Sequence, residues 1–128
     1  MNTALANETT KQNIASNSWE EVGGVKFLSI RTTAAGYMLD FRYKVLEPEK
    51  AALLINRKNK PFLKVLKNGL VLKVPNTAKI GPLRQTSLLA KKGKNYFMFF
   101  GNPGRMVKPG DKVQIQIGDF TSKTLIVE

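Results

Sequence analysis

Neither cysteine nor histidine occurs among the 128 residues of this chain. Without cysteine, the chain cannot form a disulfide, a zinc–thiolate site, an iron–sulfur cluster or a thiol nucleophile. Without histidine, it lacks the commonest general base and the commonest transition-metal ligand. Serine–histidine catalysis and histidine-bound copper or zinc are therefore excluded, and we expect neither a metal nor a cofactor.

Motifs for other chemistry are missing as well. The sequence contains no phosphate-binding glycine loop, no S-x-x-K arrangement and no D-x-D-x-D-G calcium loop. Hydrolysis by carboxylates or lysine is the least favoured hypothesis, because it needs a concave site that unites at least two of Asp40, Asp111, Asp119 and Glu47. We therefore predict that the chain is not an enzyme.

Long apolar runs are also absent. No stretch approaches the roughly 18 apolar residues that span a membrane, so we expect no transmembrane segment. The N-terminus has no apolar h-region, but Ala4-Leu5-Ala6 before Asn7 resembles an A-x-A signal cleavage site. Residues 1–6 would then be the stub of a trimmed export signal. We predict a periplasmic or secreted location, with a cytoplasmic one as the alternative.

What is present indicates one globular domain. Hydrophobic residues make up 42% and charged residues 23%, and 128 residues suit a single domain. Residues 1–18 are mostly Asn, Thr, Ser, Ala and Gln without periodicity, which predicts a flexible tail. We place a single β domain at residues 19–128.

Local patterns within that domain predict strands and one helix. From Tyr37 to Val45 every second residue is apolar, which is typical of a strand with one buried face. Asn68-Gly69 between the apolar runs 61–66 and 70–74 is the strongest short signal for a hairpin. Tyr96–Phe100 is almost continuously apolar, so we expect a central strand buried on both faces. Pro48, acidic neighbours and a following Ala-Leu run predict a short helix near 48–55.

Further strands are expected at 25–31, 113–117 and 125–127, with another at 85–89 and an irregular connector at 76–83. About seven or eight short strands with closely spaced turns predict an all-β fold, an immunoglobulin-like β-sandwich. The alternative is an OB-like barrel.

The charge is strongly uneven along the chain. The net charge is +12, and no acidic residue occurs between Glu49 and Asp111, whereas fourteen Lys and Arg do. Such a segment attracts polyanions if its charges share one surface, and it mainly maintains solubility if they are spread out. We take the following residues of this segment as anion-binding candidates: Arg57, Lys58, Lys60, Arg84, Lys91, Lys92 and Lys94.

Three segments carry a family resemblance: Gly36–Tyr43, Leu83–Thr86, and Tyr96 through Gly110. They resemble parts of small bacterial proteins of unknown function that usually carry an export signal, over about residues 20–128. The resemblance implies export and brings no activity, ligand or site residue with it. The ending Pro109-Gly110-Asp111-x-Val-x-Ile also resembles the late strands of immunoglobulin-like domains.

These observations favour a non-enzymatic, exported β-sandwich that binds a protein or an anionic component of the cell envelope. The alternative is a nucleic-acid-binding barrel that uses the basic segment 50–110, although no nucleic-acid motif supports it. The run Tyr96–Phe100 holds aromatic side chains beside Lys94, but we expect those rings to belong to the core rather than to a stacking platform.

Overall fold

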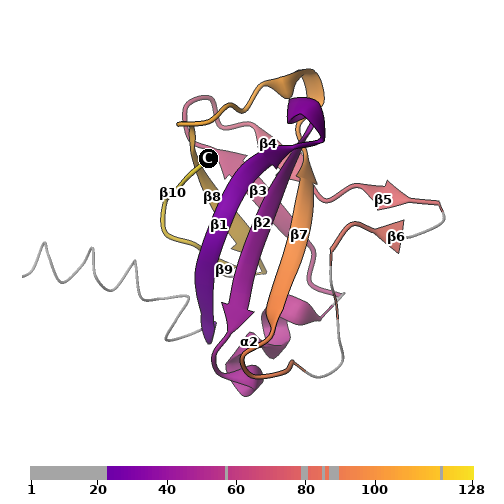
Figure 1. Ribbon diagram of the computed structural model, residues 1–128, viewed down its shortest axis with the longest axis vertical. Coiled ribbons are helices and arrows are strands. Elements are labelled where there is room, and N and C mark those ends of the chain that lie inside the picture. The colour runs from indigo at the N-terminus through magenta and orange to yellow at the C-terminus, as the bar shows by residue number, and fades with distance from the viewer. Residues whose placement is uncertain (1–22, 57, 79–80, 85, 87–89, 119) are drawn as a thin grey trace, which may run out of the picture.

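The computed structural model describes residues 23–56, 58–78, 81–84, 86, 90–118 and 120–128. These form two antiparallel sheets packed face to face, a small third sheet β5-β6 and one short α-helix (Figure 1). The strand orders of the two large sheets are β1-β2-β7 and β10-β8-β3-β4, and β9 also pairs with β8. The strands are β1 (Val25–Thr33), β2 (Met38–Val45), β3 (Pro61–Val65), β4 (Val71–Lys73), β5 (Asn76–Thr77), β6 (Gly81–Pro82), β7 (Asn95–Gly101), β8 (Lys112–Ile117), β9 (Phe120–Thr121) and β10 (Leu125–Ile126). The helices are α2 (Pro48–Ile55) and the 3-10 turns η1 (Ala34–Gly36) and η2 (Pro103–Arg105).

The connectivity is that of a Greek-key sandwich. β1 and β2 pair in the first sheet, and α2 then carries the chain across to the β3–β4 hairpin of the second sheet. The chain returns to place β7 beside β2 and crosses again to β8 and β10. Repeated crossing between two open sheets is typical of immunoglobulin-like domains. The predicted sandwich is confirmed, and the described strands form separate sheets rather than the alternative barrel.

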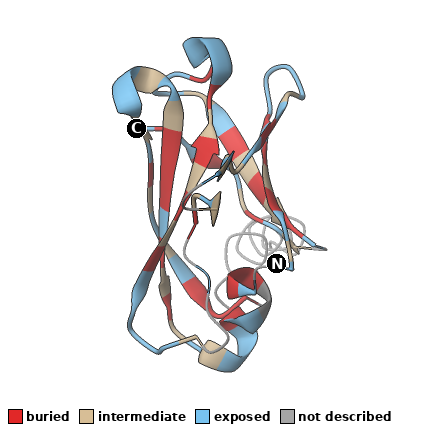
Figure 2. Ribbon diagram, turned by 90° about the vertical axis from the view of Figure 1, so that its right-hand side faces the viewer, coloured by how far each residue is buried: buried red, intermediate tan, exposed pale blue. Residues whose placement is uncertain are grey.

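Alternation along each strand builds the core. Leu39, Phe41 and Tyr43 of β2 are completely buried, as are Ile115 and Ile117 of β8 in the facing sheet. In Figure 2 buried segments alternate with more exposed ones along the strands. Each buried side chain of this size contributes about 1.5–3 kcal/mol relative to an exposed one. The inward half of each strand therefore supplies most of the cohesion between the sheets.

Most of the local predictions are confirmed. Helix α2 covers the expected residues, and the Asn68-Gly69 turn joins β3 to β4, with the Asn68 side chain accepting the Leu70 N–H at 3.0 Å. Gly69 has a φ of 72°, the left-handed conformation that glycine adopts without strain. The connector predicted at 76–83 is more ordered than expected, because β5 and β6 pair into a short ribbon that projects from the sandwich (Figure 1).

Tyr37 departs from the predicted pattern. It precedes β2 and is 55% exposed, although the alternation placed it in the core. The three residues of η1 all have positive φ, so the chain reverses there and Tyr37 lies at the end of the sandwich. Its ring is covered by the Arg105 guanidinium, 5.5 Å from the ring centroid.

The prediction for Tyr96–Phe100 is also wrong in part. β7 is the last strand of the sheet β1-β2-β7, and on its other side it meets only an isolated bridge between Met98 and Arg84. Tyr96, Met98 and Phe100 are buried, whereas Phe97 and Phe99 lie on the outer face and are only half-buried. The strand does alternate between buried and outward residues, but the outward residues Phe97 and Phe99 are also aromatic, so the sequence looked continuously apolar.

Several predictions lie outside the described residues. These are the tail at 1–18, the Ala4–Ala6 cleavage pattern, most of the strand expected at 85–89, and two individual residues, Arg57 and Asp119.

Asn102 joins two loops at the end of the sandwich where Tyr37 lies. Its side chain is almost completely buried, donates to the carbonyl oxygens of Gly36 and Val107 at 2.9 and 2.8 Å, and accepts the Val107 N–H at 3.0 Å. We expect Asn102→Ala to lower the free energy of unfolding by about 2–3 kcal/mol, since it leaves buried backbone groups unpaired. Urea unfolding measures this, with the exposed Asn95→Ala as the control. A loss equal to that of the control would contradict the assignment.

Candidate functional site

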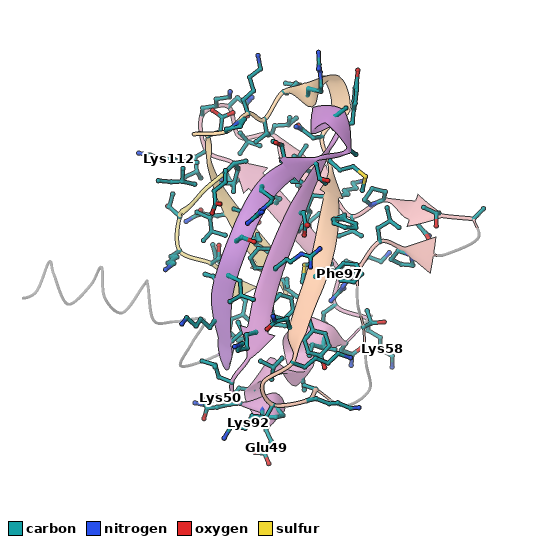
Figure 3. All side chains as sticks on the ribbon, in the orientation of Figure 1. Glu49, Lys50, Lys58, Lys92, Phe97 and Lys112 are labelled. Atoms are coloured by element: carbon teal, nitrogen blue, oxygen red, sulfur yellow. The ribbon has the colours of Figure 1, made fainter. Side chains whose placement is uncertain are left out.

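The described cations of the basic segment do not form one continuous surface. The β3–β4 turn lies at one end of the sandwich, where the Leu66 N–H donates to the Lys112 carbonyl oxygen at 3.0 Å. The turn at residues 91–94 lies at the other end, where the Gly93 N–H donates to the Val45 carbonyl oxygen at 2.8 Å. Figure 3 shows Lys112 near the upper end and Lys92 near the lower end, close to Glu49. The described cations of the segment are therefore divided between separate regions.

Three of the candidate cations lie in the lower turn. Lys91, Lys92 and Lys94 are all exposed. The Lys94 ammonium lies 5.1 Å from the centroid of the Tyr96 ring, and the nearby Lys50 pairs with Glu47 at 3.2 Å. The two hollows described next are lined by other residues. Their role in anion binding stays a prediction.

Lys58, Lys60 and Arg84 come together around Phe62 of β3. Two adjoining hollows, of about 410 and 430 Å³, share Phe62 and Lys60 as lining residues. We call their combined surface the Phe62 groove, and its lining consists of Lys58, Asn59, Lys60, Pro61, Phe62, Lys73, Val74, Asn76, Gly81, Pro82, Arg84, Thr86, Gln116 and Gly118. The groove lies beside the edge strand β4, at the base of the β5–β6 ribbon.

The described lining of the Phe62 groove is positively charged. Its described lining contains Lys58, Lys60, Lys73 and Arg84 and no acidic residue. Lys73 was not among the anion-binding candidates predicted from the sequence. In the structure Lys73 lies directly opposite Phe62 across the β3–β4 ladder. A two-residue Asn68-Gly69 turn would place Lys73 opposite Lys64, so the hairpin signal by itself did not identify this neighbour of Phe62.

Arg84 differs from the lysines because its side chain points inward. Its two terminal nitrogens donate to the carbonyl oxygens of Asn59 and Leu54 at 2.6 and 2.5 Å. Leu54 belongs to the last turn of α2, whose carbonyls lack partners within the helix, so Arg84 caps the C-terminus of this helix. Burial lowers the pKa of Arg84. These hydrogen bonds assign it a structural role in addition to its place in the groove wall.

Arg84 and Tyr43 each retain an unpaired polar atom. The Arg84 Nε and the Tyr43 hydroxyl are buried without a hydrogen-bond partner among the described residues. Burial raises the pKa of the Tyr43 hydroxyl well above its usual range, and the nearby Arg84 charge opposes that rise. The hydroxyl therefore stays neutral at all ordinary pH values.

The three described carboxylates that a hydrolase could use lie on different elements, each paired with its own cation. Asp40 pairs with Arg42 at 3.1 Å on the outer face of the first sheet. Asp111 pairs with Lys67 at 2.9 Å at one end of the sandwich. Glu47, which directly precedes α2, pairs with Lys50 in the first turn of that helix. Within the described residues, no three acidic side chains gather into a group that could hold a metal ion.

Comparison with known proteins identifies no relative. No family model, no curated protein and no solved structure matches the chain. Among the described residues, no helix is both long and apolar enough to cross a membrane.

Matched variants test the roles of Arg84 and Tyr43. We expect Arg84→Lys to lower the free energy of unfolding by about 2 kcal/mol, because one ammonium cannot satisfy carbonyls at both Asn59 and Leu54. We expect Tyr43→Phe to change it by less than about 1 kcal/mol, since the hydroxyl has no partner to lose. Urea unfolding compares the two. An equal loss in both variants would show that the hydroxyl is hydrogen-bonded after all.

Asp111 predicts a pH dependence of stability. Hydrogen bonds from the Lys108 N–H and the Lys67 ammonium, both 2.9 Å long, lower its pKa in the folded state. Its contribution is therefore complete above the unfolded pKa of about 3.9 and is lost as pH falls through the lower, folded value. We expect Asp111→Ala to destabilise the protein more at pH 7 than at pH 3, where part of the contribution has already been lost. Urea unfolding at both pH values measures the difference, and equal losses would contradict it.

Proposed function

We propose that this domain is a non-enzymatic binding module that holds an acidic segment of a partner protein in the Phe62 groove. The proposal depends on one observation, a groove whose described lining combines four cations with apolar side chains and contains no carboxylate. Uncompensated positive charge beside apolar surface favours an anionic ligand that also carries a hydrophobic group.

The shape of the groove supports an extended ligand. Lys58 lines only one of the two hollows and Lys73 only the other, with the half-buried Phe62 ring between them. An extended acidic peptide laid across the groove places carboxylates near both lysines and an apolar side chain against Phe62. The prolines Pro61 and Pro82 add rigid apolar wall to the same hollow.

The separated carboxylates support a role without catalysis, because each one described above is already paired with a cation. A periplasmic or secreted location remains part of the proposal, on the Ala4-Leu5-Ala6 pattern and the resemblance to exported proteins.

Binding of a defined peptide tests the proposal. A fluorescent peptide of six glutamates around a central phenylalanine is titrated with the wild-type protein and with two double variants. We expect Lys60→Gln/Lys73→Gln to weaken binding by about fivefold, since each exposed pair contributes about 0.5 kcal/mol. Lys92→Gln/Lys94→Gln removes the same charge at the lower end and should change binding less than twofold.

Two outcomes would count against the proposal. Equal weakening by both double variants would mean that net charge alone attracts the peptide. No binding of the peptide at low salt, together with lysine-dependent binding of vesicles rich in anionic lipid, would replace the protein partner by a component of the cell envelope.

A further inference from the structure

The outer face of the sheet β1-β2-β7 carries a second basic surface, on the opposite side of the sandwich from the Phe62 groove. The strand register arranges its side chains in rows across the three strands. One row joins Lys26, Lys44 and Asn95, and the next joins Ser29, Arg42 and Phe97. A third row joins Arg31, Asp40 and Phe99.

The first row places two like charges side by side. Lys26 and Lys44 are direct cross-strand partners, an arrangement that destabilises a sheet. Among the described residues, neither lysine forms a salt bridge with a carboxylate. The single acidic residue of the three rows, Asp40, is 9% exposed and is already paired with Arg42. A bound anion would offset the repulsion between the two lysines.

Two phenyl rings lie on the same face, Phe97 opposite Arg42 and Phe99 opposite Asp40. Phe97 and Phe99 face away from the core and contact each other, with ring centroids 5.3 Å apart. They alternate along β7, so their Cα atoms are about 7 Å apart along the strand. Figure 3 shows Phe97 on the near face of this sheet. The core does not account for the rings, because Tyr96, Met98 and Phe100 already fill the inward positions of the same strand.

We propose that this face binds single-stranded nucleic acid, with two bases against Phe97 and Phe99 and the phosphates near Lys26, Arg42 and Lys44. Aromatic rings next to cations on one exposed face are the arrangement that such ligands need, because bases stack on the rings while phosphates pair with the cations. In a duplex the bases are paired and cannot stack on the phenyl rings, and a polyanion without rings has nothing to stack on them. Single strands are therefore favoured over both.

This site differs from the one considered from the sequence. The basic segment 50–110 supplies Phe97 and Phe99, but the cations Lys26, Arg42 and Lys44 lie before it in the chain. The proposal does not depend on the Phe62 groove, which is lined by other residues.

Fluorescence anisotropy with a labelled twelve-nucleotide thymidine strand tests the inference, with a duplex and inorganic polyphosphate as competitors. We expect Phe97→Leu/Phe99→Leu to weaken binding of the single strand by about tenfold or more. Lys26→Gln/Lys44→Gln should also weaken it and should reduce the slope of log affinity against log salt by about 1.4. The lysine variant should be as stable as the wild type or more so, because it removes a like-charge pair.

Matched controls are available elsewhere on the molecule. Tyr37→Leu removes an exposed ring at the end of the sandwich, and Lys64→Gln/Lys112→Gln removes two exposed cations from the other sheet. Both should bind the thymidine strand within twofold of the wild type.

The inference is overturned if the thymidine strand does not bind at low salt. It is also overturned if polyphosphate competes equally well and the phenyl variant binds like the wild type, since the face is then a charge patch alone. Thermal unfolding establishes that each variant is folded, and the lysine variant provides an independent result if the phenyl variant is not.

Discussion

A ladder of inward-facing aromatic rings holds the first sheet in register. Phe27 contacts Phe41, Phe41 stacks on Tyr43, and Tyr43 stacks on Tyr96, with ring centroids 5.5, 5.6 and 5.8 Å apart. The ladder therefore crosses β1, β2 and β7. Because side chains alternate along a strand, a shift of one residue would turn these rings towards solvent. The packing of the rings thus determines the outer face as well, and it directs Lys26, Lys44 and Phe97 outward together.

The same dependence on the core applies to the Phe62 groove. Leu63 and Val65 of β3 are completely buried, so Phe62 between Pro61 and Leu63 must face outward. Arg84 then ties the groove wall to the end of α2 through backbone carbonyls. The groove is built from a strand edge, a helix end and a connecting segment that meet only in the folded chain.

The positive charge of the folded protein is divided between cations that are paired with carboxylates and cations that are not. A chain with a net charge of +12 could owe all of that charge to solubility. In the folded protein some cations are matched, as in the pairs Lys67–Asp111 and Arg42–Asp40. Others, such as Lys26 and Lys44 on the first sheet and Lys73 on the second, form no salt bridge within the described residues. These unmatched groups, rather than the net charge, distinguish candidate binding surfaces from a solvated exterior.

Short-range patterns in the sequence determined the strands, the β3–β4 hairpin and helix α2. Alternating apolar residues, an Asn-Gly pair and a proline at a helix start act over a few residues, so they need no knowledge of the rest of the chain. Sequence also indicated three of the four groove cations, through the long segment without acidic residues. It did not reveal Lys73 as a member of the site.

Only the tertiary structure decided which strand lies at a sheet edge and which cations share a surface. The run Tyr96–Phe100 looked central because all its residues are apolar, yet β7 pairs along its length with β2 alone and meets only an isolated bridge from Arg84 on its other side. Arg84 looked like a surface cation, and it caps a helix thirty residues earlier in the chain. Contacts between residues this far apart in the sequence depend on how the two sheets pack over their core, and a pattern within a few residues carries no information about that packing.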